Sequence, residues 1–181
     1  MPELWELRDE QERPTGKYIT RGEPIPQGYW HIVVTIWTLT ADGRLLLTQR
    51  QPEKHMGLLW EGTAGSVQAG ETSREGALRE LREETGLRAD PEQLRLLSSE
   101  RKERFFADTY IYLCPQAEPM LTLQKEEVAD ACFVSPEEMD DWFGKMAPPA
   151  VERYRRDREA IEAAAAACRE KWRTGHDGKA L

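Results

Sequence analysis

The chain has 181 residues and a formal net charge of −8, a size that suits one domain with a sizeable core. The excess of acidic residues argues against a general binder of nucleic acids or anionic membranes. No apolar run approaches the ~20 residues of a transmembrane helix, and the acidic start lacks the apolar region of a secretory signal. Cys114, Cys132 and Cys168 are widely spaced, as is typical of reduced thiols, so we expect a cytoplasmic protein. Because apolar segments of this length are missing, we expect no membrane partner.

Strand signals dominate the first half of the chain. Two short strands surround a turn-rich segment, and a Pro/Gly loop then leads into a β-branched run that is apolar on both faces. An Ala-Asp-Gly turn predicts that this run forms a hairpin with the strand that follows it. The predicted strands span residues 4–8, 17–21, 30–40, 44–50, 60–67, 94–104, 108–114 and 129–134.

Three helices are expected. The central one lies between Thr72, which has capping-box spacing to Glu75, and Gly86, a residue type that ends helices in the left-handed conformation. A second helix begins at Ser135, and a long one occupies about residues 148–173. This order predicts an α+β fold, an α/β/α sandwich with a mixed β-sheet. We expect a single domain over residues 1–181, with an N-terminal hairpin extension at 1–29, a core at 30–141 and a C-terminal helix outside that core.

The central helix carries a cluster of carboxylates. Glu80 lies three residues before Glu83 and four before Glu84, so all three share one side of the helix. Like charges at these spacings repel each other unless a cation lies between them. Carboxylate oxygens are hard ligands that suit Mg²⁺ or Mn²⁺. The spacing therefore favours a divalent-cation site over an ordinary solvated acidic face.

Residues 65–87 resemble the signature motif of the Nudix family: Gly, five residues, Glu, seven residues, then Arg-Glu-apolar-X-Glu-Glu-X-Gly-apolar. The chain fills this motif without a departure. A chance match at a given start is on the order of one in 10⁸ from ordinary residue frequencies. The resemblance implies the Nudix fold and the hydrolysis of a diphosphate linkage. The matching residues are Gly65, Glu71, Arg79, Glu80, Leu81, Glu83, Glu84, Gly86 and Leu87.

The resemblance also implies roles for the residues of the motif. Glu71 and Arg79 would orient the loop and the helix by ion pairing instead of taking part in the chemistry. The residues that would bind Mg²⁺ or Mn²⁺ are Glu80, Glu83 and Glu84 through their carboxylates and Gly65 through its backbone carbonyl.

The identity of the general base differs among family members, and two residues fit this role. Glu80 is one candidate. Glu127 is the other, because it lies six residues before an aromatic residue on the last predicted strand, with the neighbouring Glu126 as the fallback. For both of these later glutamates, a solvated turn is the alternative interpretation.

Two cationic residues indicate which subgroup of the family the chain resembles. Arg50 ends a predicted strand and Lys54 follows four residues later, so both are expected to bind the diphosphate away from the metal. This spacing and the N-terminal segment resemble the Nudix subgroup related to isopentenyl diphosphate isomerase. That isomerase uses a Cys and a His in the segment before the motif. Here the segment reads EGTAGSV, with no Cys and with Ser66 where the His is expected, so these departures point toward hydrolysis.

The sequence therefore predicts a metal-dependent hydrolase that cleaves a phosphoanhydride linkage in a nucleoside diphosphate linked to another moiety, or in a related small molecule. The expected partner is a small-molecule diphosphate, and the family habit is compatible with a homodimer. Three alternatives stay open: an isopentenyl-diphosphate isomerase-like enzyme, a non-catalytic nucleotide-binding module, and a hydrolase of nucleic-acid ends, which the net negative charge disfavours.

Overall fold

The computed structural model describes residues 3–177, and strands account for most of its core. The strands are β1 (Leu4–Arg8), β2 (Pro14–Thr20), β3 (His31–Leu39), β4 (Leu45–Arg50), β5 (Trp60–Glu61), β6 (Thr63–Ser66), β7 (Leu94–Arg101), β8 (Phe105–Leu113) and β9 (Val128–Val134). The helices are α1 (Ser73–Thr85), α2 (Met139–Trp142) and α3 (Pro148–Asp177), with 3₁₀ turns at Pro91–Gln93, Pro136–Glu138 and Phe143–Lys145.

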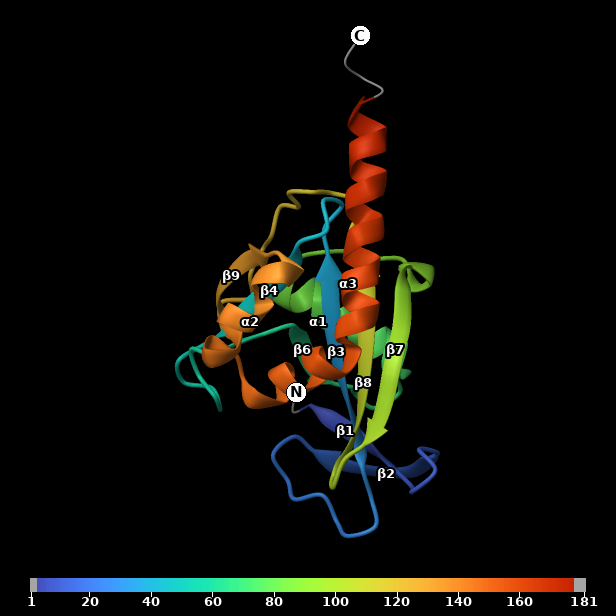
Figure 1. Cartoon of the computed structure of the whole chain (residues 1–181). Helices are drawn as coiled ribbons and strands as arrows, with labels where there is room; N and C mark the ends of the chain where they lie inside the picture. Colours follow the sequence, from blue (N-terminus) through green and yellow to red (C-terminus); the bar gives the residue numbers. More distant parts are fainter. Residues whose placement is uncertain (1–2, 178–181) are drawn as a thin grey trace.

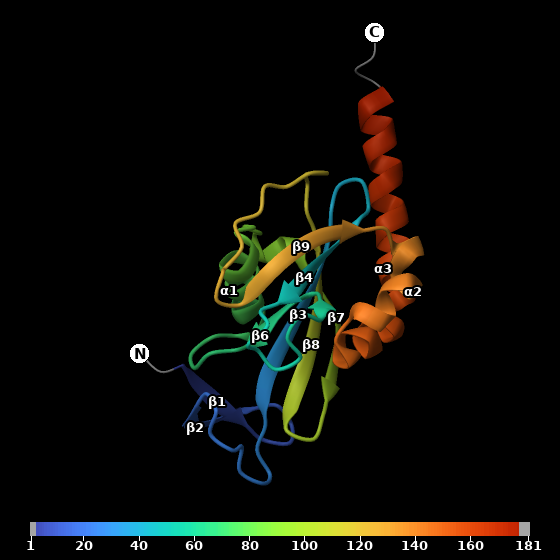
Figure 2. The ribbon, with the colours of Figure 1, turned by 90° about the vertical axis from the view of Figure 1, so that its left-hand side faces the viewer.

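Within these residues, seven strands form one mixed sheet. Its path of neighbours is β5-β4-β3-β8-β7, with β6 also paired to β3 and β9 also paired to β4. β1 and β2 form a separate antiparallel pair at one end of the molecule, where the sequence predicted a hairpin (Figure 1). The helix α1 covers one face of the sheet, and α2 and α3 cover the other (Figure 2). The α+β prediction with helices on both faces is confirmed.

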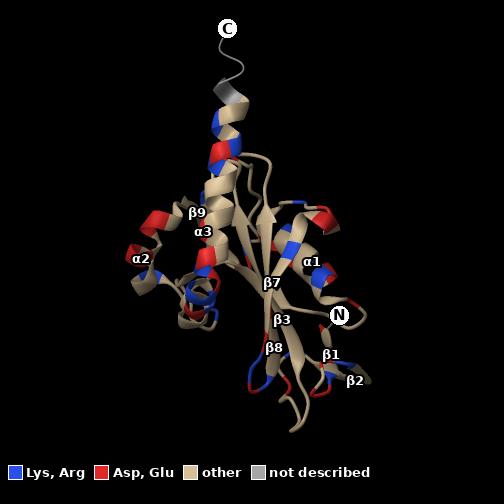
Figure 3. Cartoon of the chain, turned by 45° about the vertical axis from the view of Figure 1, so that its right-hand side comes forward, with Lys and Arg blue, Asp and Glu red and all other residues tan. Residues whose placement is uncertain are grey.

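β3 shows why its sequence is apolar on both faces. Val34 and Ile36 pack into the core cluster under α1, whereas Trp37 and Leu39 pack into the cluster under α3. Side chains of a strand alternate between faces, so a strand covered on both sides needs an unbroken apolar run. β3 itself carries no Lys, Arg, Asp or Glu, whereas the helices carry many of the charged residues (Figure 3).

The predicted hairpin between β3 and β4 is only partly formed. The two strands pair antiparallel at Leu39 and Leu45 beside the turn and then diverge. β4 instead pairs along its length with β9, while β3 pairs with β8 in parallel and with β6 antiparallel. The turn residues specify a local reversal, but the partners of a strand beyond its turn are set by residues distant in the sequence.

The strand predicted over residues 60–67 is split in two at Gly62. β5 pairs with β4, and after Gly62 the chain crosses over so that β6 pairs with β3. A Cβ atom at Gly62 would lie 3.0 Å from both the carbonyl oxygen of Ile36 and the ring of Trp37, so the crossing depends on a residue without a side chain. The sheet opens between these two pairings.

The predicted helices are found with adjusted ends. α1 has the predicted capping box, and Gly86 follows it with φ of 77°. The segment after Ser135 starts as a 3₁₀ turn and continues into the short α2. α3 runs beyond the predicted residue 173 to Asp177, and its far half extends past the sheet (Figure 1). Among the helices of residues 3–177, none has the length and apolar character needed to cross a membrane.

Candidate active site

A polar cleft of about 480 Å³ lies where the sheet opens between the β4–β5 pair and the β3–β6 pair. The acidic side of α1 borders it on one side and the start of α3 on the other. Most of the site residues predicted from the sequence line it: Arg50, Gly65, Arg79, Glu80, Glu83, Glu84 and Glu127.

Local sequence fixes the direction in which α1 presents its carboxylates. The side chain of Glu75 accepts a hydrogen bond from the backbone N–H of Thr72 at 2.8 Å, and the Thr72 hydroxyl accepts one from the backbone N–H of Glu75. Leu81 is fully buried against the sheet, so the neighbouring Glu80 and Glu84 are directed toward the cleft.

Burial and mutual repulsion raise the affinity of these carboxylates for positive charge. Glu84 is only 9% exposed, and burial, followed by the charges of Glu80, Glu61 and Glu127, raises its pKa well above its usual range. Burial also raises the pKa of Glu80 to about 7, although Arg79 opposes this shift. Such a cluster is stabilised by a shared cation.

Gly65 is in direct contact with one of the predicted ligands. A Cβ atom at this position would lie 2.1 Å from the carboxyl carbon of Glu80, so the carboxylate rests on the bare backbone of β6. The structure therefore brings the backbone of Gly65 and the carboxylate of Glu80 together, as the predicted metal site requires.

Arg79 ties the helix to the preceding loop. Its guanidinium donates to Glu71 Oε1 at 2.7 Å, to the backbone carbonyl of Ser66 at 2.9 Å and to Glu80 Oε1 at 2.8 Å. The same guanidinium also donates a hydrogen bond to Glu83 Oε2 at 3.1 Å. Glu71 lies behind this guanidinium, outside the residues that line the cleft, which suits the orienting role predicted for it.

The donor set fits a hard divalent cation, since it consists of carboxylate and carbonyl oxygens. In this conformation Arg79 occupies oxygens of Glu80 and Glu83. Consistent with that, no group of three His, Cys, Asp or Glu side chains within the described residues stands at metal-binding distances. Binding a cation there would require these two carboxylates to turn away from the guanidinium.

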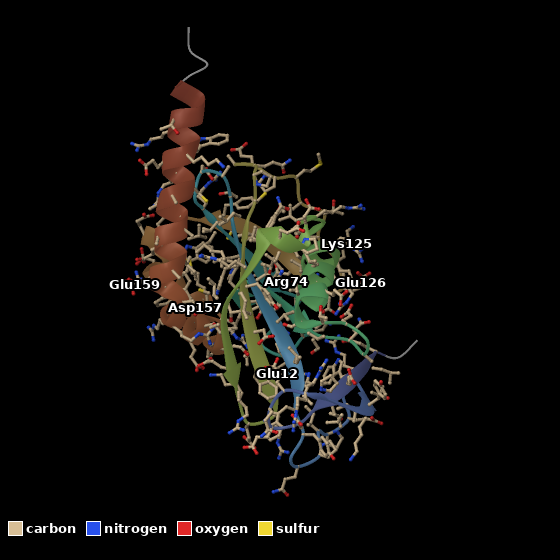
Figure 4. The ribbon with its side chains drawn as sticks, turned by 90° about the vertical axis from the view of Figure 1, so that its right-hand side faces the viewer. Glu12, Arg74, Lys125, Glu126, Asp157 and Glu159 are labelled. Carbon is tan, nitrogen blue, oxygen red and sulfur yellow. The ribbon has the colours of Figure 1, made fainter. Side chains whose placement is uncertain are left out.

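The predicted base and the predicted cations lie across the cleft from α1. Glu127 lines the cleft and accepts a bond from Lys54 Nζ at 2.5 Å, so Lys54 reaches the site through this partner. Arg50 forms an ion pair with Glu61 on the adjacent strand and donates to the backbone carbonyl of His55 at 2.8 Å. Glu126 is exposed and lies with Lys125 beside α1 (Figure 4).

Sequence reasoning missed four charged residues of the cleft. Glu61 lies on β5, and Arg153 comes from α3. Glu3 and Arg21 come from the N-terminal hairpin and form an ion pair at 2.8 Å. None belongs to the motif, and each comes from a segment whose place at the cleft depends on tertiary pairing. For Glu61, a charged residue amid apolar neighbours of a predicted strand was the available signal.

The family model that matches this chain is that of the NUDIX domain, over residues 29–156. The chain is 39% identical over 140 residues to an uncharacterized Nudix hydrolase of Listeria monocytogenes, covering 76% of this chain and 83% of that relative. The chain belongs to the Nudix family.

Solved structures show the same Nudix fold. DR0079 from Deinococcus radiodurans superposes with a TM-score of 0.70 at 22% identity, covering 85% of this chain and 98% of that one. A bifunctional NMN adenylyltransferase/ADP ribose pyrophosphatase from Francisella tularensis, in complex with AMP and a Mn ion, gives a TM-score of 0.60 at 19% identity, covering 73% and 42% of the two chains.

The Nudix assignment makes this protein a pyrophosphohydrolase of a family that acts on nucleoside diphosphate derivatives and generally depends on divalent metals. The likeness to isopentenyl-diphosphate Delta-isomerase is more limited. The Salmonella heidelberg isomerase is 34% identical over 86 residues, which is 45% of this chain and 46% of that enzyme.

Proposed function

We propose that this Nudix hydrolase cleaves the phosphoanhydride linkage of a nucleoside diphosphate joined to another moiety, with Mg²⁺ or Mn²⁺ bound by Glu80, Glu83, Glu84 and the carbonyl of Gly65. The observation that carries the proposal is the convergence of these carboxylates with Arg50 and Glu127 on one cleft. A divalent cation in such a site neutralises phosphate charge and makes a bound water nucleophilic.

The residues of the chain would divide the remaining work between the two sides of the cleft. Glu80 or Glu127 accepts the proton of the attacking water, since both carboxylates face the cleft. Arg79, held by Glu71, keeps α1 and the loop before it in place. Arg50 and Lys54 bind phosphate oxygens once the diphosphate competes with their present partners, Glu61 and Glu127.

Release of phosphate or nucleotide from a panel of diphosphate compounds tests the proposal. The panel contains nucleoside triphosphates, dinucleotides, nucleotide sugars and isopentenyl diphosphate, each with Mg²⁺, with Mn²⁺ and with chelator. We expect chelator-sensitive cleavage of one nucleotide class. Isomerisation of isopentenyl diphosphate without any hydrolysis would favour the isomerase alternative, and binding without turnover would favour a nucleotide-binding module.

Three further predictions accompany this proposal: a single domain over residues 1–181, a homodimer, and a cytoplasmic location with reduced cysteines. Light scattering of the purified chain measures the oligomeric state. A molar mass equal to that of one 20.8 kDa chain at all concentrations would rule out the dimer.

A further inference from the structure

Arg153 is a buried cation without a bonding partner. Its residue is 8% exposed, and it lines the cleft from α3. Within residues 3–177, its guanidinium makes no hydrogen bond and no ion pair. Burial lowers the pKa of Arg153, but an arginine stays charged at neutral pH. None of its nitrogens is among the fully enclosed unpartnered atoms, so this weakly solvated charge is accessible from the cleft, where an anion would stabilise it.

The backbone fixes Arg153 at the end of the cleft next to β5. The N–H of Ala147 donates to the carbonyl of Trp60 at 2.9 Å, and Met146 pairs with Trp60 as a parallel bridge. These bonds place the start of α3 beside Glu61. Asp157, one turn after Arg153, points toward the sheet and Glu159 points away, so Arg153 lies on the covered face of α3 (Figure 4).

The charges around Arg153 leave an excess of positive charge. Glu61 is the acid that acts most strongly on it, but this carboxylate is already ion-paired with Arg50. The more distant acids are also engaged. Glu100 pairs with Arg156 and Lys102, and Glu152 pairs with Lys102. Two guanidinium groups therefore face the cleft with one carboxylate between them.

The helix start itself offers an anion few donors, because Pro148 and Pro149 lack backbone N–H groups. An anion at this end of the cleft would therefore be bound through side chains. Guanidinium groups match the geometry of phosphate oxygens, to which they can donate two parallel hydrogen bonds.

We propose that Arg153, together with Arg50, binds an unesterified terminal phosphate of the substrate at the β5 end of the cleft. This inference rests on the proposed function and deepens it: the moiety linked to the nucleoside diphosphate is, or ends in, a phosphate. A terminal phosphate carries up to two negative charges, whereas each phosphate group of a nucleotide sugar or dinucleotide is substituted on both sides and carries one. The terminal phosphate therefore compensates an excess of positive charge better.

The test is the binding of methylenediphosphonate, a diphosphate mimic that cannot be hydrolysed, measured by calorimetry with Mg²⁺. The variants are Arg153→Gln, Arg153→Lys and the control Arg155→Gln. Arg155 lies on the same helix, is exposed and stacks on Phe143 outside the cleft. We expect Kd to rise at least ten-fold in Arg153→Gln, to recover partly in Arg153→Lys and to stay unchanged in Arg155→Gln.

Thermal unfolding separates a binding role from a structural one. Removing an unpaired buried charge leaves Tm at or above that of the wild type, so Arg153→Gln is expected to lose ligand affinity without losing stability. Wild-type affinity in Arg153→Gln, or a drop of several degrees in its Tm, would overturn the inference. Absence of diphosphonate binding by the wild type would do the same.

The substrate panel distinguishes this inference from the proposed function. We expect the wild type to favour nucleoside triphosphates over nucleotide sugars at least ten-fold in kcat/KM, and Arg153→Gln to lose most of that preference through KM. Metal-dependent cleavage without such a preference would refute the inference and leave the hydrolase proposal standing. Diphosphonate binding through Arg153 without any hydrolysis would support the anion site and refute the hydrolase.

Discussion

The two ends of the cleft carry opposite charge imbalances. At the α1 end, carboxylates including Glu80 and Glu83 gather around the guanidinium of Arg79. At the β5 end, the guanidinium groups of Arg50 and Arg153 face the carboxylate of Glu61. The first end is short of positive charge and the second is short of negative charge. A diphosphate that meets metal ions at one end and arginines at the other would compensate both.

The largest expected effect comes from removing one charge at the acidic end. Glu83→Gln or Glu84→Gln should lower metal-dependent kcat by roughly 10³-fold or more, because a neutral amide is a poor ligand for a divalent cation. The fold should persist, and Glu84→Gln should raise Tm because it removes a buried, repelled carboxylate.

Steady-state kinetics and thermal melts check this prediction, with Glu92→Gln, an exposed acid shortly after α1, as the control. Wild-type turnover in either α1 variant would contradict the metal assignment and with it the contrast between the two ends.

At the basic end, Glu61→Gln should strengthen the binding of an anion and lower the stability of the fold. The loss of its carboxylate leaves Arg50 and Arg153 without a counter-charge, so the free energy of unfolding should fall by about 2 kcal/mol. This is less than the cost of breaking a fully buried ion pair, because Arg50 stays partly exposed. Methylenediphosphonate should bind at least three-fold more tightly, since the ligand no longer competes with Glu61.

Denaturant melts and calorimetry measure the two quantities on the same preparation. Glu53→Gln, an exposed acid on the loop after β4, is the matched control. Weaker diphosphonate binding in Glu61→Gln would show that Glu61 organises the arginines instead of competing for them.

A smaller effect is expected from Gly65→Ala, which tests the contact between β6 and α1. The new methyl group would occupy the space of the Glu80 carboxyl group, so this carboxylate must turn away. Because a flexible side chain end can move, stability should change by less than ~1 kcal/mol, while kcat falls about 10- to 100-fold.

Gly144→Ala is the control for that experiment, since a Cβ atom there meets nothing within 4 Å. Full activity of Gly65→Ala would mean that the position of Glu80 against β6 is irrelevant to the acidic end.

The smallest effect concerns the side of the cleft formed by the hairpin, which belongs to neither end. His31 stacks on Trp5 with ring centroids 4.3 Å apart, and burial lowers its pKa from 6.5 to about 4. The folded state therefore favours neutral His31. This stability is complete above pH 6.5 and is lost progressively as the pH falls toward 4, by about 1.4 kcal/mol at pH 5.5.

Denaturant melts at pH 7.5 and 5.5 measure this loss, and His31→Phe should reduce it while the exposed His55→Asn should not. An identical pH dependence in wild type and His31→Phe would show that protonation of His31 does not cause the loss of stability.

The acidic end could be predicted from sequence because it is local. Thr72, Glu75 and Gly86 specify where α1 starts and stops, and helix geometry then places Glu80, Glu83 and Glu84 together. The burial of β3 on both faces was equally predictable, since it depends on the unbroken apolar run within one strand. In both regions the spacing along the chain determines the spacing in space.

The basic end could not be predicted in the same way. Arg50 was found through its spacing to Lys54, but its partner Glu61 depends on the pairing of β4 with β5. Arg153 depends on the docking of a segment almost a hundred residues later in the chain. The residues around Arg153 in the sequence are typical of a charged helix surface. Only the tertiary contact of Ala147 with Trp60 places Arg153 at the cleft.

The bond from Ala147 to Trp60 also has a consequence for the order of synthesis. The acidic end lies within a short stretch made early, whereas the wall that carries Arg153 is translated later and must then dock beside β5. In a nascent chain that has folded only its sheet and α1, the cleft would still lack the side formed by α3. The basic end of the cleft would thus be completed after the acidic end.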